Sequence, residues 1–257
     1  MSSRPALFLF LLLLPLAAAC AGPAPVEPAA ETAPAAAAPA ETAAFIPREV
    51  TPADIPPDIQ ENSWARLPGI ERERLDAEGQ RVFDLIVNPD SRYASGLRGP
   101  IGMWMYSPPM AEHLFPASTY LRFGADNERD QRLVELAILT AARALDSQYE
   151  WSAHEGLGRA AGLEEGIIEL LRFGRPLEGV DTPGLGETER TIVTMVRQLI
   201  EAPKVDAETF ATARRLFGEQ GLMDLAGLVG HYTTVNYTLK TFDVQRAPGQ
   251  QLLLPRP

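Results

Sequence analysis

Apolar residues recur at three- and four-residue spacing from about Asn62 onward, and no stretch keeps the strict alternation that is typical of strands. This pattern predicts an all-α domain built from a string of seven or eight amphipathic helices. The expected helices cover residues 77–87, 108–123, 127–144, 147–161, 164–173, 187–202, 207–217 and 223–242.

Capping side chains and helix-ending glycines set these boundaries. Asp76, Ser107 before Pro108, Asp126, Ser147 and Asp206 can each cap the first turn of a helix. The expected ends are Gly162, Gly174 and Gly218, and Pro116 should bend the helix that contains it. Residues 91–106 and 175–186 are expected as connecting loops, and the helical domain is expected over residues 59–247, with a tail at 248–257.

The N-terminus is typical of a secretory leader. Arg4 precedes a Leu-rich apolar run, and small residues follow it immediately before Cys20. Residues 1–19 are therefore predicted to be a lipoprotein signal peptide, with lipid attached to the thiol of Cys20. The alternative is an ordinary secretory leader in which Cys20 is incidental. Residues 20–58 are rich in Ala and Pro without a hydrophobic period, which predicts a disordered tether.

This leader predicts a lipid-anchored protein of the cell envelope that faces the periplasm. The residue after Cys20 is Ala21 and not Asp, which favours the outer membrane over the inner one. The lipid anchor would then be the only contact with the membrane.

Composition excludes several kinds of chemistry. The chain has 257 residues, a formal net charge of −11 and only two lysines, Lys204 and Lys240. A nucleic-acid partner is not expected, because phosphate binding needs a basic face. Cys20 is the only cysteine, so the helical domain has no thiol for catalysis, disulfides or metal binding. The histidines and carboxylates show no recognisable metal-ligand spacing, and neither a metal nor another cofactor is expected.

The segment from Tyr149 to His154 holds the best candidate for catalysis. Glu150 and His154 are four residues apart, so they share one face of a helix. Glu135 lies on the preceding helix, and a short loop would bring it close to them. A histidine between two carboxylates can move protons. The alternative is a solvent-facing pair of Glu150 and His154 without a catalytic role.

These residues belong to a longer resemblance. Gly99 to Gly174 resembles the carboxymuconolactone decarboxylase family of the alkylhydroperoxidase-D-like (AhpD-like) superfamily, which implies an AhpD-like helical bundle. The resemblance is carried by the helix Leu133 to Leu139 with Ala142-Arg143, by Tyr149-Glu150-Trp151 and His154, by Ala160 to Leu163, and by the helix from Gly230 to Asp243.

One departure from the superfamily decides a point of chemistry. Its thiol-peroxidase branch carries a cysteine pair where this chain has Ser147 and Glu150, between Glu135 and His154. Peroxide reduction through a thiolate and a disulfide is therefore not expected.

The non-thiol branch implies a cofactor-free carboxy-lyase or isomerase that acts on a small organic acid or lactone. By this resemblance His154 would shuttle the proton, with Glu150 and Glu135 orienting or supplying it. The candidate substrate-binding residues are Arg143, Arg132, Trp104, Tyr106, Trp151 and His231. For the arginines the alternative is a surface salt bridge, and for the aromatic residues and His231 it is ordinary core packing.

Two functional hypotheses remain open. In one, the domain is an enzyme; in the other, it is a binding or scaffold lipoprotein that uses the same fold without turnover. An enzyme should hold His154 in a concave pocket with a perturbed pKa. The resemblance also implies a homo-oligomer, as a trimer or a multiple of it.

Overall fold

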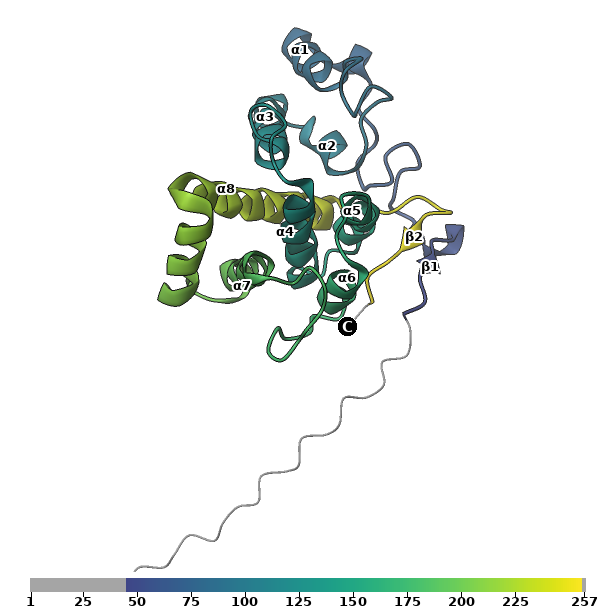
Figure 1. The fold of residues 1–257 in the computed structure, drawn as a ribbon. Coiled ribbons are helices and arrows are strands. Elements are labelled where there is room, and N and C mark those ends of the chain that lie inside the picture. The colour runs from purple at the N-terminus through teal and green to yellow at the C-terminus, as the bar shows by residue number, and fades with distance from the viewer. Residues whose placement is uncertain (1–44, 256–257) are drawn as a thin grey trace, which may run out of the picture. The chain divides into compact units, whose positions relative to one another are not determined.

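The structure, a computed structural model, describes residues 45–255, so the predicted signal peptide and Cys20 lie outside the described residues. Eight α-helices and two very short strands make up most of this part, which confirms the predicted all-α class (Figure 1). The elements are β1 (Arg48–Glu49), α1 (Ala77–Ile86), α2 (Gly99–Trp104), α3 (Pro108–Phe123), α4 (Gln131–Ala144), α5 (Gln148–Ala160), α6 (Glu165–Arg172), α7 (Glu187–Glu201), α8 (Ala207–Phe242) and β2 (Gln251–Leu252).

Helix α4 lies at the centre of the domain. It contacts α3, α5, α6, α7 and α8, and nine of its residues, from Val134 to Ala142, are buried in succession (Figure 1). Seven of these nine residues are apolar, as expected of a helix that is buried on all sides, and the two exceptions are Glu135 and Thr140. The larger apolar core therefore forms around α4, with side chains from α5, α6, α7 and the middle of α8.

A second apolar cluster packs α1, α2 and the start of α3 against the C-terminal half of α8. Trp104 is buried there, and its indole Nε1 donates a hydrogen bond of 3.1 Å to Oγ1 of Thr238. This cluster fixes α2 and the loop before it against the same helix, α8, that reaches into the larger core.

Three details differ from the predicted helices. Helix α2 forms inside the segment that was expected to be a loop. It begins at Gly99 and Pro100, and most of its six residues are buried. Asp130 and not Asp126 caps α4, because its side chain accepts from the backbone N–H of Arg132 and Leu133. Gly218 breaks α8 as predicted, with φ 68° and ψ −178°, but helical structure resumes directly after it.

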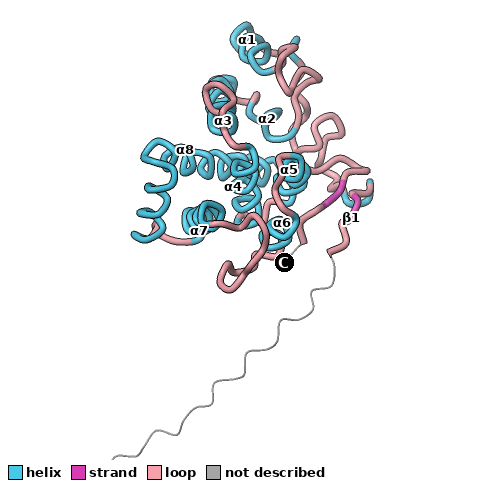
Figure 2. Tube along the Cα trace, in the orientation of Figure 1, coloured by secondary structure: helices cyan, strands magenta, loops and turns pink. Residues whose placement is uncertain are grey.

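The two ends of the described chain meet in a short antiparallel pair. Arg48 pairs with Leu252 and Glu49 with Gln251. Figure 2 colours the short strands magenta and the helices cyan. Val50 and Leu254, on either side of the pair, are buried. The structure thus places residues 45–58 and 248–255 on the domain, where a tether and a tail were expected. We call 45–54 and 244–255 the terminal strap.

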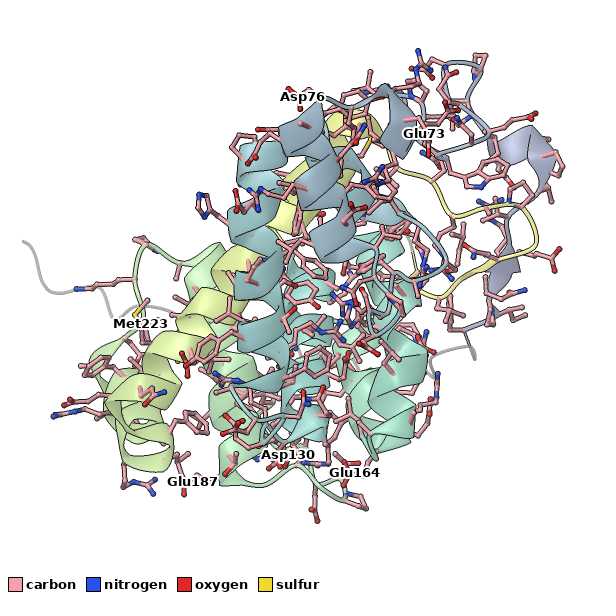
Figure 3. The ribbon with its side chains drawn as sticks, turned by 90° about the horizontal axis from the view of Figure 1, so that it is seen from above. Glu73, Asp76, Asp130, Glu164, Glu187 and Met223 are labelled. Atoms are coloured by element: carbon pink, nitrogen blue, oxygen red, sulfur yellow. The ribbon has the colours of Figure 1, made fainter. Side chains whose placement is uncertain are left out.

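The beginnings of three helices gather at one edge of the domain. Figure 3 labels Asp130, Glu164 and Glu187 there, next to the N-termini of α4, α6 and α7. Carboxylates in these positions favour the partial positive charge of a helix N-terminus. None of the helices within residues 45–255 is both long and apolar enough to cross a bilayer.

Candidate active site

Helices α4 and α5 bring Glu135 and His154 into contact. The link between them is only Leu145 to Ser147, with Asp146 at φ 48°, so the two helices pack along each other. Oε2 of Glu135 lies 2.7 Å from Nδ1 of His154. Both side chains are buried, with exposed fractions of 3% and 8%. The carboxylate holds the ring in one orientation and leaves Nε2 as the nitrogen that can react.

Two further side chains face Nε2 of His154. Oε2 of Glu150 lies 3.3 Å from it, one helical turn back on α5. The hydroxyl of Tyr232, on α8, lies 3.4 Å from the same nitrogen. Nε2 is thus surrounded by a carboxylate and a phenol, both of which can exchange protons with it.

Arg122 completes the buried charge cluster from α3. Its Nη2 donates a hydrogen bond of 3.1 Å to Oε1 of Glu135, the oxygen that does not face His154. The guanidinium is 8% exposed, and its Nε has no hydrogen-bond partner. Buried donors are almost always satisfied in proteins, so this N–H has a hydrogen bond still to make.

A cavity of about 250 Å³ lies over these groups. Its wall includes Arg122, Glu150, His154 and Tyr232, together with the exposed arginines Arg92 and Arg98. Pockets for drug-sized ligands occupy roughly 300–1,000 Å³, so this one fits a small molecule. The cavity is lined by three arginines, by the imidazoles of His154 and His231 and by one carboxylate, Glu150, so its arginines outnumber its carboxylates and suit an organic anion.

The environment of His154 favours its charged form. Burial of the ring opposes charge, but hydrogen bonds to Glu135 and Glu150 outweigh that effect and raise the pKa of His154 above its ordinary value. Burial raises the pKa of Tyr232 well above the usual range of a phenol. Both shifts favour the protonated form of the side chain, which is the imidazolium for His154 and the neutral phenol for Tyr232.

His231 lies in the wall of the same cavity, but its pKa is shifted in the opposite direction from the pKa of His154. Its ring contacts Trp104 and Tyr232 edge-on, with centroids 5.6 and 5.4 Å away. Burial lowers the pKa of His231 to about 4. It is a neutral ring at physiological pH, and no carboxylate within ion-pair distance is described for it.

The other predicted substrate-binding residues lie elsewhere. Arg132 pairs with Glu164 and Glu189 at 2.6 and 2.7 Å, at the start of α4. Arg143 contacts Asp146 at 3.3 Å and the carbonyl of Pro255, in a separate cavity. Both arginines form salt bridges, which was the alternative to a role in substrate binding.

The predicted aromatic residues do not line the cavity either. Trp104 packs behind His231, and Trp151 is fully buried with its Nε1 hydrogen-bonded to Glu155. The hydroxyl of Tyr106 donates to the carbonyl of Pro68, away from α5. Of the six candidates, the structure brings only His231 to the site.

Sequence reasoning missed Arg122 and Tyr232 as functional residues. Tyr232 is adjacent to His231, but adjacent helical residues point in different directions and gave no reason to expect both in one wall. Arg122 follows an apolar stretch of α3, and a lone cation at a helix end is usually exposed. Its contact with Glu135 depends on the packing of α3 against α4, which the pattern does not encode.

Within residues 45–255, no group of His, Asp or Glu side chains is arranged to hold a metal ion.

Comparison with known proteins supports the fold. No protein-family model matches the chain, and neither does any curated protein. A solved structure described as an alkylhydroperoxidase AhpD core, an uncharacterised peroxidase-related protein from Ralstonia eutropha, is similar with a TM-score of 0.54 and 15% identity. The match covers 71% of this chain and 92% of that one.

A second solved structure, a protein of unknown function from Agrobacterium tumefaciens described as a putative antioxidant defence protein AhpD, has a TM-score of 0.47 and 20% identity. That match covers 58% of this chain and 98% of that one. Identities this low show shared architecture and not shared chemistry. On the evidence of the first similarity, the chain has an AhpD-like helical fold.

Proposed function

We propose that this protein is a cofactor-free acid/base enzyme that transfers a proton to a carbon of a small organic acid or lactone. The observation that carries the proposal is the buried imidazole of His154, held by Glu135 at 2.7 Å and presenting Nε2 to a cavity. A histidine fixed on one nitrogen by a carboxylate is an arrangement that general acid–base catalysis requires.

The cavity supports a carboxylate-bearing substrate. Nε of Arg122 is buried without a partner beside His154, and Arg92 and Arg98 add positive charge at the exposed side of the cavity. A guanidinium binds a carboxylate through charge-assisted hydrogen bonds. These three arginines take the place of Arg143 and Arg132 in the proposal.

The raised pKa of His154 supports decarboxylation over proton abstraction, because it favours the form of the ring that can donate a proton. An imidazolium can give a proton but cannot accept one. When a substrate carboxylate leaves as CO₂, its bonding electrons remain on carbon, and Nε2 of His154 can protonate that carbon. Solvent then returns a proton to the ring. An isomerisation through the same groups would need His154 in its neutral form at the start.

Thiol-dependent peroxide reduction does not fit this chain. Glu150 faces His154, and the sequence has no cysteine beyond Cys20. A thiol-dependent peroxidase activity is therefore not part of the proposal.

The proposal is tested by incorporation of deuterium from D₂O into carboxylated lactones and related acids, followed by NMR with the purified protein. Wild type should release CO₂ and form a product that carries deuterium at the carbon from which the carboxylate left. His154→Gln should lose about 10²- to 10⁴-fold in rate, the usual contribution of a general acid. The matched control is His113→Gln, which replaces an exposed histidine on α3.

Two results would refute the catalytic proposal. One is equal labelling by wild type and His154→Gln across the whole panel. The other is saturable binding of the acids by wild type with no labelling and no CO₂, which would favour the binding-protein alternative.

We further propose that the enzyme is anchored in the cell envelope through Cys20. The support is the leader pattern in residues 1–19. A labelled fatty acid should appear on the protein in a bacterial host and be absent from Cys20→Ala. Label that persists on Cys20→Ala would contradict the anchor. A homo-oligomer and the absence of a nucleic-acid partner stay predictions.

A further inference from the structure

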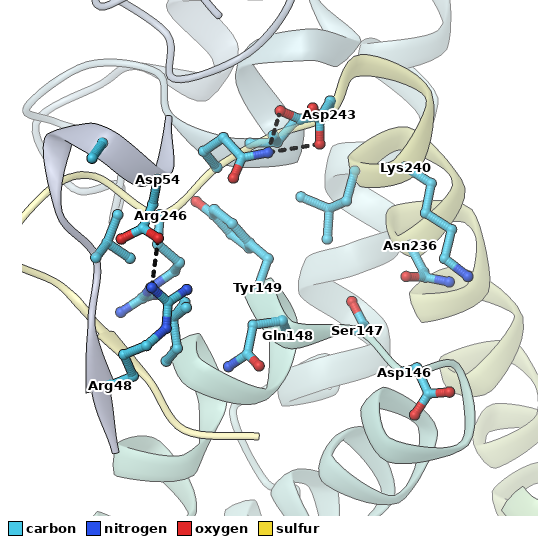
Figure 4. Close-up of a pocket in the computed structure, with 16 residues that line it drawn as sticks. Arg48, Asp54, Asp146, Ser147, Gln148, Tyr149, Asn236, Lys240, Asp243 and Arg246 are labelled. Atoms are coloured by element: carbon cyan, nitrogen blue, oxygen red, sulfur yellow. Dashed lines mark hydrogen bonds and ion pairs between the residues drawn. The ribbon is translucent and has the colours of Figure 1, made fainter. Parts of the chain in front are cut away.

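A second cavity, of about 480 Å³, lies between the terminal strap and the start of α5. Its wall is formed by the strap, by Asp146 to Tyr149 and by the C-terminal end of α8 (Figure 4). Only Tyr149 lines both this cavity and the one over His154. The strap cavity, as we call it, plays no part in the chemistry described above.

Two of the cations that line the strap cavity are not paired with a carboxylate of the described residues. Three carboxylates line it, but each has an arginine: Asp54 lies 2.5 Å from Arg48, Asp146 3.3 Å from Arg143, and Asp243 3.7 Å from Arg66. Two lining cations, Lys240 and Arg246, have no ion pair within residues 45–255. The unpaired charge that faces the cavity is therefore positive.

Two buried N–H groups in the same wall also lack partners. Asn236 is 1% exposed, and its Nδ2 makes no hydrogen bond. Nε of Arg246 is buried without a partner as well, while its guanidinium lies over the ring of Tyr149 at 5.7 Å. An unsatisfied buried donor costs about 1–3 kcal/mol, and two such donors in one wall indicate that a ligand supplies acceptors.

The polar groups of the strap cavity lie on two opposite sides, and apolar side chains also form part of the wall. Figure 4 shows Arg48 and Arg246 on one side of the cavity and Asn236 and Lys240 on the opposite side, with Tyr149 between them. The apolar part of the wall consists of Val50, Ala53, Leu239, Val244 and Leu252. A single inorganic anion would meet only one polar side and leave the apolar part uncovered.

We propose that the strap cavity is a second binding site, which takes an elongated organic acid with a carboxylate at each end. Arg246 holds one carboxylate, and Lys240 with the Asn236 amide holds the other. The aliphatic spacer packs on the side chains of the strap and of α8. This site is separate from the His154 cavity and does not depend on the function proposed for it.

The test is calorimetric titration of the full-length protein with adipate, compared with hexanoate and 1,6-hexanediol. Adipate should bind saturably, hexanoate more weakly, and the uncharged diol not at all. Lys240→Met and Arg246→Met should each weaken adipate binding about tenfold or more, the usual effect of losing a charge-assisted hydrogen bond. Lys240 is exposed, so its replacement leaves the fold intact.

Two controls separate this site from the first cavity. Arg214→Met removes an exposed arginine far along α8 and should leave adipate binding unchanged. His154→Gln should also bind adipate normally, whatever becomes of its activity. The proposal is overturned if adipate shows no saturable binding in the millimolar range, or if His154→Gln abolishes binding while Lys240→Met does not.

Discussion

Glu135 contacts two neighbouring side chains through different oxygens. One of its oxygens binds Nδ1 of His154 and the other binds Nη2 of Arg122. In the proposed enzyme it is a positioning residue, because it orients the imidazole and favours its charged form. A carboxylate in this position raises the basicity of the ring it holds.

Replacement of this carboxylate should change the pH profile as well as the rate. In Glu135→Gln the hydrogen bond to His154 can persist, but its charge is lost, so the raised pKa of His154 should fall. If His154 acts as an acid, activity should decline at a lower pH than in wild type. The rate against pH checks this, with NMR titration of the His154 ring. An unshifted ring titration would contradict it.

His231 predicts a pH effect on stability with a definite sign. Its pKa is about 4 in the folded protein and about 6.5 in an unfolded chain, so between these values only the unfolded chain takes up a proton. The stability from this group is complete above pH 6.5 and is lost as the pH falls towards 4. The loss amounts to roughly 3 kcal/mol at most.

Urea unfolding of wild type and His231→Gln between pH 7 and pH 4 measures this effect. The stability of wild type should fall more steeply with acid than that of the variant. Parallel curves for the two proteins would show that His231 stays neutral or is accessible in both states.

The cluster of Glu135, Glu150 and His154 was the part of the candidate site that sequence could predict. Glu150 and His154 share a helix face by spacing alone, and a three-residue link brings Glu135 beside them. Arg122 comes from α3, the helix before α4, and Tyr232 comes from α8, 78 residues beyond His154. Their approach depends on helix packing, which local periodicity does not contain.

At the scale of elements, the break in α8 rests on one glycine. Gly218 has φ 68° and ψ −178°, a conformation that side chains strongly disfavour, and a Cβ there would meet no atom within 4 Å. Gly218→Ala should therefore lower the free energy of unfolding by about 1–3 kcal/mol through backbone strain alone.

The matched control is Gly156→Ala, in the exposed interior of α5, where a Cβ also meets nothing within 4 Å. That change should stabilise the protein by about 0.5–1 kcal/mol, because alanine is the better helix former. Thermal or urea unfolding compares the two. A neutral Gly218→Ala would mean that α8 can straighten at this point.

The predicted helices were recognisable because their apolar faces repeat and their ends carry Asp, Ser or Gly. Helix α2 was missed because a six-residue helix has too few positions to show a period. The cap of α4 was misplaced because Asp126 and Asp130 are equivalent by type, and only hydrogen bonds distinguish them.

At the scale of the whole domain, a buried ion pair fastens the terminal strap. Nη1 of Arg172 lies 2.9 Å from Oε2 of Glu155, and the same nitrogen donates to the carbonyl of Leu253. Both charged side chains are at most 4% exposed. This ion pair joins the strap to α5 and α6. The pairing of β1 with β2 covers only two residues on each strand and adds little further stabilisation.

Arg172→Met should cost about 3–5 kcal/mol in unfolding free energy, since it leaves the Glu155 carboxylate buried with less compensation. Arg172→Met combined with Glu155→Gln should recover part of that loss. Urea unfolding of the two single variants and the double variant measures the coupling. Strictly additive changes would contradict a direct pair.

The ordered strap could not be predicted from sequence. Its residues are rich in proline and polar side chains and have no period, which is the composition of a linker. They are held by contacts with distant groups such as Arg172, and those partners are visible only in three dimensions.

Tyr149 forms part of the wall of both cavities. Its phenol is thus a boundary of two chambers, each bordered by its own cations. Truncating that ring to alanine should widen both chambers with one substitution, so that each should accept a bulkier acid than it does in the wild-type protein.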